Sequence, residues 1–570
     1  MIEFIALNMA PIMFASLVIF LLLGYPVAFS LAANGLVFFA IGVWLAPYSD
    51  NTITLDWPLL FTMPQRLWGV MSNETLLAIP FFTFMGIVLE RSGMAEDLLD
   101  TVGQLFGPIR GGLAYAVILV GALLAATTGV VAASVIAMGL ISLPIMLRYG
   151  YDRRVASGVI AASGTLAQII PPSLVLIVLA DQLGRSVGDM YKGAMLPGLV
   201  LTGFYMAYVF FVSMLRPQWV PALPLEARTL GHGVTSLLVA VAAAMGIGYG
   251  AHVALFATYG ANADVLGATL GIGAIYGYAL IDGALGIGLL SRLASQVIRV
   301  LIPPLALIFL VLGTIFLGIA TPTEGGAMGA VGALVLAAMK GRFSMAVVTQ
   351  ALESTTRLSA FVMFILIGAR VFSLSFYGVN GHIWVEHLLT GLPGGQTGFL
   401  IFVSLLVFLL AFFLDFFELA FIIVPLLIAP AEALGIDLIW FGVILGVNMQ
   451  TSFMHPPFGF ALFYLRSVAP KSSYTDKVTG IRTAGVTTGQ IYYGAIPFVI
   501  IQVAMIGVVI GFPQLVMHYK GVVVDPSTVQ IVVPQMQTLG APAGTEGSGL
   551  QTLGAPKLGA PKLGAPVITP

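Results

Sequence analysis

The chain has 570 residues, of which 59% are hydrophobic and 8% charged, and its mean hydropathy is +1.04. Soluble domains carry about 25% charged residues, so this composition excludes an ordinary soluble protein and indicates a chain held mostly in lipid. The balance of 23 Lys and Arg against 24 Asp and Glu gives no basis for binding nucleic acid, and the absence of Cys excludes thiolate metal sites and cysteine nucleophiles.

Apolar stretches recur along the chain, and a transmembrane helix needs roughly 20 apolar residues. The predicted apolar stretches are 9–47 (broken at Gly24-Tyr25-Pro26), 75–91, 112–147, 155–181, 195–215, 231–255, 266–290, 298–318, 323–340, 357–377, 397–433, 439–466 and 489–512. The first is too long and continuous for a cleaved signal peptide, so we expect it to remain as a span. The predicted fold class is an all-α polytopic membrane protein.

Two segments, one in each half of the chain, repeat the same pattern. Gly150-Tyr151-Asp152 is followed by an apolar helix and by Ile170-Pro171-Pro172, and Gly435-Ile436-Asp437 is followed by a similar helix and by His455-Pro456-Pro457. The spacing from the Gly to the Pro pair is identical in the two copies (150 to 171 and 435 to 456). Because two prolines in mid-span remove backbone donors and block a helix, we expect broken helices over 155–181 and 439–466.

A long apolar stretch with a polar or small cluster near its middle precedes each broken helix. The stretches are 112–147 and 397–433, and the clusters are Thr127-Thr128-Gly129 and Asp415-Phe416-Phe417-Glu418. This pattern predicts two re-entrant helical hairpins whose tips stop inside the membrane. Close helix packing through small residues is the alternative for the first tip.

Positive charge orients the two copies in opposite senses. Cytoplasmic loops are enriched in Lys and Arg. Arg148, Arg153 and Arg154 precede the first broken helix, whereas the second one exits into Arg466, Lys471, Lys477 and Arg482. Arg185 and Lys192 are the exceptions, and fall outside. Inverted repeats with interrupted helices are typical of secondary transporters.

These features predict four parts of the chain. They are an N-terminal repeat half over 1–228, two additional spans over 229–297, a C-terminal repeat half over 298–515 and a tail over 521–570. The tail repeats Leu-Gly-Ala-Pro, starting at Leu539, Leu553, Leu558 and Leu563. Such a composition cannot bury a core, so we expect the tail to be disordered, and we expect it on the periplasmic side.

The interrupted helices and the first hairpin tip are the candidate ion sites. Unwound carbonyls and nearby hydroxyls can supply the oxygen ligands that a sodium ion needs. The candidate ligands are Thr127, Thr128, Gly129, Gly164, Thr165, Pro171, Asn448, Thr451 and Pro456. A proline kink repaired by a neighbouring helix is the alternative.

Five further residues are candidates for substrate binding or coupling: Ser173, Arg370, Asp415, Glu418 and Gln450. Intramembrane carboxylates are usually functional. The alternative for Asp415 and Glu418 is an ion pair with Arg370, the one Arg deep in an apolar run, and the two roles can coexist. By contrast, Thr321-Pro322-Thr323-Glu324 has the spacing of a helix capping box.

Several motifs in the same order resemble the large permease subunit of tripartite ATP-independent periplasmic (TRAP) transporters, and the resemblance covers residues 10–515. The motifs are Asn73-Glu74-Thr75-Leu76-Leu77-Ala78-Ile79-Pro80 with Glu90-Arg91-Ser92-Gly93, Gly164-Thr165 with Ile170-Pro171-Pro172-Ser173, Thr321-Pro322-Thr323-Glu324, and Pro456-Pro457 with Gly459. The segments Asp415–Glu418 and Met454–Phe460 are similar to the mannitol or chloroaromatic branch, whose members are associated with 2-oxo acids and lactate.

The resemblance implies an elevator-type transporter of the bacterial inner membrane, with sodium as the coupling ion and no other cofactor. It implies import of a small organic anion, with a 2-oxo acid or lactate-type monocarboxylate as the first guess. It also implies two partners, a soluble periplasmic binding protein and a small membrane subunit of four spans. Since the added spans at 231–290 number only two, we expect the small subunit on a separate chain.

The sequence departs from the family at the first hairpin, where many members have Gly-Ser-Ser and this chain has Gly129-Val130-Val131. This departure leaves Thr127, Thr128 and the backbone as ligands there. An enzyme is not expected, because the chain has no H-E-x-x-H helix and no credible Ser–His pair. The main alternative is an ion-coupled carboxylate carrier that works without a binding protein.

Overall fold

The computed structural model describes residues 2–128, 131–231, 233–260, 263–476 and 478–520. The chain divides into two units, Met1–Tyr519 and Lys520–Pro570, and the account below concerns the first. The predicted tail over 521–570 lies outside the described residues.

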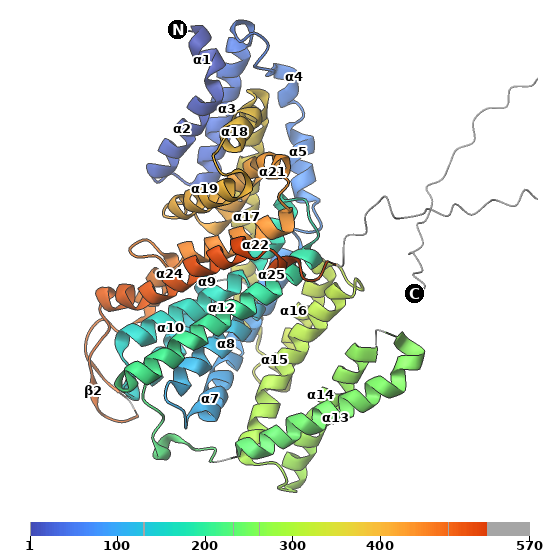
Figure 1. Ribbon diagram of the computed structural model, residues 1–570, viewed down its shortest axis with the longest axis vertical. Coiled ribbons are helices and arrows are strands. Elements are labelled where there is room, and N and C mark those ends of the chain that lie inside the picture. The colour runs from blue at the N-terminus through green and yellow to red at the C-terminus, as the bar shows by residue number, and fades with distance from the viewer. Residues whose placement is uncertain (1, 129–130, 232, 261–262, 477, 521–570) are drawn as a thin grey trace, which may run out of the picture. The chain divides into compact units, whose positions relative to one another are not determined.

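The first unit is almost entirely helical (Figure 1). The helices before the second half of the chain are α1 (Ile2–Leu7), α2 (Met9–Leu22), α3 (Val27–Leu45), α4 (Trp57–Leu60), α5 (Met63–Met71), α6 (Ala78–Arg91), α7 (Met94–Phe106), α8 (Gly112–Thr128), α9 (Val131–Arg148), α10 (Arg153–Thr165), α11 (Leu174–Gln182), α12 (Val187–Leu215), α13 (Val234–Tyr259) and α14 (Ala263–Leu285). They are followed by α15 (Arg292–Phe316), α16 (Pro322–Met339), α17 (Met345–Gly378), α18 (Gly381–Thr390), α19 (Gly395–Leu410), α20 (Phe416–Glu418), α21 (Val424–Ala433), α22 (Leu438–Ser452), α23 (Phe460–Val468), α24 (Thr488–Gly511) and α25 (Gln514–Met517).

Short elements complete the chain. The 3-10 turns are η1 (Ala46–Tyr48), η2 (Leu166–Gln168), η3 (Pro217–Trp219) and η4 (Leu225–Ala227), and η6 (Leu419–Ile423) is a π-helical turn. Within the described ranges the only strands are β1 (Tyr474–Thr475) and β2 (Arg482–Thr483), which pair antiparallel with Tyr474 opposite Thr483.

Nine of the described helices are long and apolar enough to cross a membrane, and the bent pair α18–α19 would make a tenth. The predicted polytopic all-α fold is therefore confirmed. The apolar stretches 112–147 and 397–433 each fold as two helical arms. The first pair is α8 and α9, and the second runs from α19 through a turn at 411–415 to α20, η6 and α21.

The repeated Gly-x-Asp motif marks the same backbone event in both copies. Gly150 and Gly435 have φ of +80° and +70°, a left-handed conformation that ends the preceding helix. Asp152 and Asp437 then cap the next helix, and their carboxylates accept main-chain N–H bonds at 2.9 Å from Arg154 and 2.8 Å from Ile439. Each motif thus stops one helix and starts the broken one.

Both helices are broken in the segments that contain the Pro pairs, as predicted. The first leaves α10 at Thr165, passes through η2 and resumes as α11 at Leu174, and the second stops at the end of α22 and resumes as α23 at Phe460. The peptide bonds Pro171-Pro172 and Pro456-Pro457 are both cis.

Contacts between the halves are reciprocal. The first broken helix, α10, packs on α24 of the second half, and α22 of the second half packs on α12 of the first. The α10–α24 contact is close, since a Cβ on Gly158 would meet the carbonyl of Gly494 and a Cβ on Gly494 would meet that of Arg154. In Figure 1, α24 lies beside α10 and α12.

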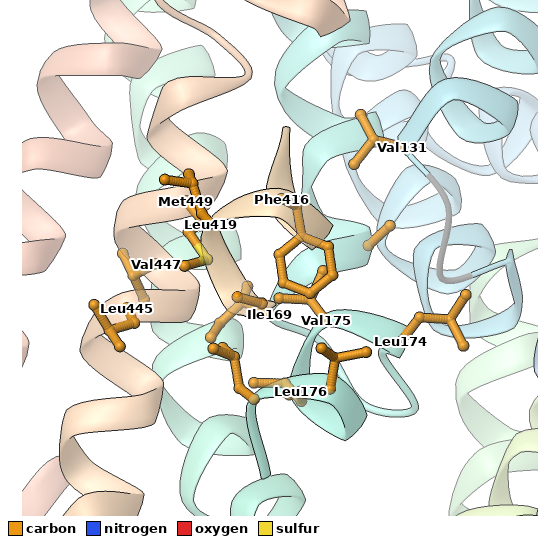
Figure 2. Close-up of a cluster of buried hydrophobic side chains, with 14 of the residues drawn as sticks. Val131, Ile169, Leu174, Val175, Leu176, Phe416, Leu419, Leu445, Val447 and Met449 are labelled. Carbon is orange, nitrogen blue, oxygen red and sulfur yellow. The ribbon is translucent and has the colours of Figure 1, made fainter. Parts of the chain in front are cut away.

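A cluster of buried apolar side chains lies where the first break and α22 meet the second hairpin (Figure 2). Ile169 of the first break and Leu176 of α11 lie toward Leu445, Val447 and Met449 of α22, with Phe416 and Leu419 of the second hairpin beside them. These side chains are buried. Since lipid tails are as apolar as these side chains, close van der Waals packing holds the first break against α22 and the second hairpin.

Among the ion pairs that join the two halves of the chain are Arg148–Asp476 and Arg185–Glu432. Arg148 Nε lies 3.0 Å from Asp476 Oδ2, which connects the two Arg- and Lys-rich loops. Arg185 Nη2 lies 3.3 Å from Glu432 Oε1, beside the second Gly-x-Asp motif.

Candidate functional site

A cluster of four buried polar side chains lies between the two halves. The side-chain amide of Gln450 donates to the Thr165 hydroxyl and to the Tyr205 hydroxyl, at 3.3 Å in each case. The amide of Gln502 donates to Tyr205 at 2.7 Å and to Thr165 at 3.5 Å. All four residues are 0% exposed. Each half contributes one residue from its broken helix and one from the helix that follows, α12 or α24.

Buried amide oxygens near the breaks have no hydrogen-bond partner in the described part of the chain. They are Gln168 Oε1, Asn448 Oδ1, Gln450 Oε1 and Gln502 Oε1. Leaving such an acceptor buried and unpaired is unfavourable by about 1–3 kcal/mol. Amide oxygens are also ligands that hard cations prefer. The chemistry of these groups therefore fits the predicted sodium coupling.

The predicted hydroxyl ligands bond back to their own helices. Thr165 donates to the Ala162 carbonyl at 2.8 Å and Thr451 to the Val447 carbonyl at 3.1 Å. Each hydroxyl oxygen keeps acceptor capacity after donating, and that of Thr165 receives the glutamine amides. Ser173 donates to the Gln168 carbonyl at 2.8 Å, inside the first break.

The remaining predicted ligands take backbone or packing positions. Gly164 lies where a Cβ would clash with Val135 of α9, so it permits the close approach of α10 to the first hairpin. Asn448 donates from Nδ2 to the Ser404 carbonyl of α19 at 2.7 Å. Pro171 is buried, whereas Pro456 is partly exposed. Thr127 and Thr128 end α8, but their side chains and all of Gly129 lie outside the described residues.

Asp415 and Glu418 form a capping box at the start of α20. The Glu418 main-chain N–H donates to Asp415 Oδ1 at 2.8 Å, and the Asp415 N–H donates to Glu418 Oε2 at 2.8 Å. The alternative of an ion pair with Arg370 is wrong: Arg370 is exposed on α17, and within the described residues it pairs with neither carboxylate. The capping box predicted for Thr321 and Glu324 is confirmed.

Glu418 also lines a cleft of about 560 Å³. The cleft lies between the turn after α2, the start of α3, α17 and the second hairpin, and its wall is mostly aromatic and aliphatic. The aromatic residues that line it are Tyr25, Phe29, Phe361, Phe364 and Phe413. A volume of this size accommodates a small organic molecule.

The structure adds three residues that the sequence pattern did not single out as site residues. Tyr205 and Gln502 complete the polar cluster from apolar helices with no local motif around them. His455, which directly precedes the second Pro pair, is 3% exposed and lies against Phe412, with ring centroids 4.0 Å apart. Its place in the motif was visible, but its aromatic surroundings come from another segment of the chain.

Comparison with known proteins places these features in a wider group. The model of the family described as "Tripartite ATP-independent periplasmic transporter, DctM component" matches residues 14–515. A C4-dicarboxylate TRAP transporter large permease protein of Rhodobacter capsulatus is 26% identical over 489 residues, which cover 83% of this chain and 93% of the relative. Its namesake in Pseudomonas aeruginosa is 29% identical over 408 residues, which cover 71% of this chain and 79% of the relative.

A solved structure shares the fold. The crystal structure of the Alcanivorax borkumensis YdaH transporter, described as having an unusual topology, aligns with a TM-score of 0.50 at 15% identity. The alignment covers 86% of this chain and 99% of the YdaH chain.

Proposed function

Because this chain belongs to the DctM-component family of tripartite ATP-independent periplasmic transporters, and is thus a large transporter permease rather than an enzyme, we propose that it imports a small organic acid by sodium coupling. The observation that carries the proposal is the pair of matched helix breaks joined by the Thr165–Gln450 contact. Interrupted helices that meet within a membrane protein offer unpaired backbone and side-chain oxygens to an ion.

Support for sodium comes from the donor set. Four of the unpartnered groups near the breaks are neutral amide oxygens, those of Gln168, Asn448, Gln450 and Gln502, and the nearby Thr165 and Thr451 add hydroxyl oxygens. Such a set suits a hard monovalent cation better than a transition metal, which prefers imidazole or thiolate ligands. Sodium bound at the two breaks would then bias the fold toward the state that binds substrate.

The proposed substrate class rests on resemblance. The relatives compared above are named for C4-dicarboxylates, and the segments Asp415–Glu418 and Met454–Phe460 resemble the branch associated with 2-oxo acids and lactate. We therefore place a 2-oxo acid or a lactate-type monocarboxylate first among the organic acids to test.

The partners in this proposal are a small membrane subunit of four spans on a separate chain and a soluble periplasmic binding protein. The chain would lie in the inner membrane, with its tail in the periplasm. An ion-coupled carboxylate carrier that needs no binding protein is the second candidate, since broken helices and buried oxygens fit both.

The experiment is uptake of labelled pyruvate and lactate into proteoliposomes that contain this chain and its small partner. Uptake is measured with and without an inward sodium gradient, and with and without the cognate binding protein. A requirement for both supports the tripartite, sodium-coupled function. Sodium-driven uptake without the binding protein favours the second candidate, and the absence of uptake for every organic acid tested contradicts both.

A further inference from the structure

His455 is a buried imidazole whose hydrogen-bonding groups are unused. It lies in the second helix break, between α22 and α23, and is 3% exposed. Neither ring nitrogen has a hydrogen-bond partner on another residue of the described chain. A neutral imidazole carries one N–H donor and one acceptor nitrogen, and leaving both buried without partners is unfavourable. Both ring nitrogens therefore need a hydrogen-bond partner from outside the described chain.

The helix break itself does not require an imidazole at this position. His455 directly precedes the second Pro pair, and the matched residue directly before the first Pro pair is Ile170. Ile170 is 8% exposed and packs in the apolar core. An aliphatic side chain therefore fills the same position in the first break, and the polar atoms of His455 are additional to what the break needs.

Aromatic rings from the second hairpin surround the imidazole. The ring centroid of Phe412 lies 4.0 Å from that of His455, and the centroid of Phe408 lies 5.1 Å away. Phe412 belongs to the turn between α19 and α20, and its ring also contacts Phe458 at 5.6 Å. The second hairpin thus places two apolar rings, one from α19 and one from the turn, against the imidazole, and these rings provide no counter-ion.

The turn that contacts His455 also lines the cleft beside Glu418. Phe413, the next residue of the same turn, lines the cleft and contacts the Phe458 ring at 6.3 Å. Phe413 and Phe458 are 56% and 46% exposed. The turn whose Phe412 contacts the imidazole therefore also forms part of the cleft wall.

We propose that His455 is a substrate-binding residue, which hydrogen-bonds the oxygen on C2 of a small 2-hydroxy or 2-oxo acid while Phe408 and Phe412 contact its carbon skeleton. An uncharged hydroxyl or carbonyl oxygen matches an imidazole among phenyl rings, because a full charge there would lose its hydration without gaining a counter-ion. The substrate carboxylate is then left to groups outside this aromatic cluster. The inference rests on the proposed organic-acid transport.

The test compares acids that differ only at C2. Labelled lactate and propionate are taken up into proteoliposomes that contain the complex, and KM and the maximal rate are measured for each. In the unaltered protein we expect a lower KM for lactate. In His455→Leu the KM for lactate should rise about tenfold, the scale of one lost hydrogen bond, whereas the KM for propionate should change little.

Two further variants separate binding from folding. His455→Gln keeps a donor and an acceptor, so it should recover part of the preference for lactate over propionate even if His455→Leu assembles poorly. His387→Leu makes the same chemical change on an exposed face of α18 and should keep the preference of the unaltered protein.

The outcomes distinguish this inference from the proposed function. Uptake with equal KM for lactate and propionate, or an unchanged preference in His455→Leu, would overturn the role of His455 and leave transport standing. Failure of the unaltered protein to take up any organic acid would overturn the proposed function, and the role of His455 with it.

Discussion

The Thr165 hydroxyl and the Gln450 amide lie 3.3 Å apart, and the two residues hold the same place in their repeats. Each follows its motif glycine at the same spacing (150 to 165 and 435 to 450). The polar cluster therefore marks the place where the two broken helices are joined.

Gln450→Leu should destabilise the protein by about 1–3 kcal/mol, because it removes two hydrogen bonds to buried hydroxyls. The measurement is the melting temperature of the purified complex in detergent. Gln218→Leu, on an exposed turn, makes the same change in chemistry and should melt like the unaltered protein. Equal melting temperatures for Gln450→Leu and Gln218→Leu would show that the cluster contributes no stability.

Thr451→Ala should weaken activation by sodium more than it weakens folding. We expect the sodium concentration for half-maximal uptake to rise about tenfold, the effect of losing about 1.4 kcal/mol of ion binding. Thr356→Ala is the matched control, because Thr356 is an exposed residue of α17 whose hydroxyl makes the same bond to the carbonyl four residues earlier. If both variants keep the sodium dependence of the unaltered protein, Thr451 is not an ion ligand.

Gly158→Ala should prevent close packing of α10 on α24, because the added methyl would meet the Gly494 carbonyl. Overpacking of this kind costs about 1–3 kcal/mol. The carbonyl oxygen and carbon of Gly494 belong to the backbone, so they cannot rotate away from the methyl. Folded yield and melting temperature report the loss. Gly507→Ala on α24 has open space around the new methyl, and should fold normally. A Gly158→Ala protein with normal yield and melting temperature would contradict the tight fit.

Asp476→Asn should lower stability at neutral pH and have less effect in acid. Main-chain hydrogen bonding from Thr479 and the side chain of Arg148 lower the pKa of Asp476 to about 2, against about 3.9 for an unfolded chain. A lowered folded-state pKa adds stability above pH 4 that is lost as the pH falls toward 2. The difference in melting temperature between the variant and the unaltered protein should therefore shrink over that interval.

Asp50→Asn, on an exposed loop, is the control for the loss of a carboxylate. A pH-independent difference for Asp476→Asn would mean that the ionised carboxylate does not support the link between the two loops.

Local sequence patterns predicted the helix breaks and one helix cap, because these elements depend on adjacent residues. The Gly-x-Asp and Pro-Pro motifs identified both helix breaks, since turn conformation, capping and the loss of N–H donors depend on a few adjacent residues. The capping box at Thr321 and Glu324 followed from spacing alone. Asp415 and Glu418 have the same spacing, but their carboxylates suggested function first, and their reciprocal capping bonds emerged only from the structure.

Contacts between distant segments could not be predicted in this way. Tyr205 and Gln502 lie on α12 and α24, 297 residues apart in sequence, and nothing near either residue distinguishes it from other polar residues of apolar helices. Likewise, the rings around His455 come from the second hairpin, so its burial depends on how that hairpin folds back. Such pairings depend on tertiary packing, which the periodicity of one sequence does not encode.

The pair α13–α14 adds two candidate spans between the halves, packed on each other where the backbones approach at Gly248 and Gly267. Its link to α15 includes the Arg299 guanidinium, which donates to the Ala279 carbonyl at 2.7 Å. An even number of crossings returns the chain to the side from which it left. Two added spans therefore leave the orientation of the second repeat across the membrane unchanged. A single added span would have inverted that orientation.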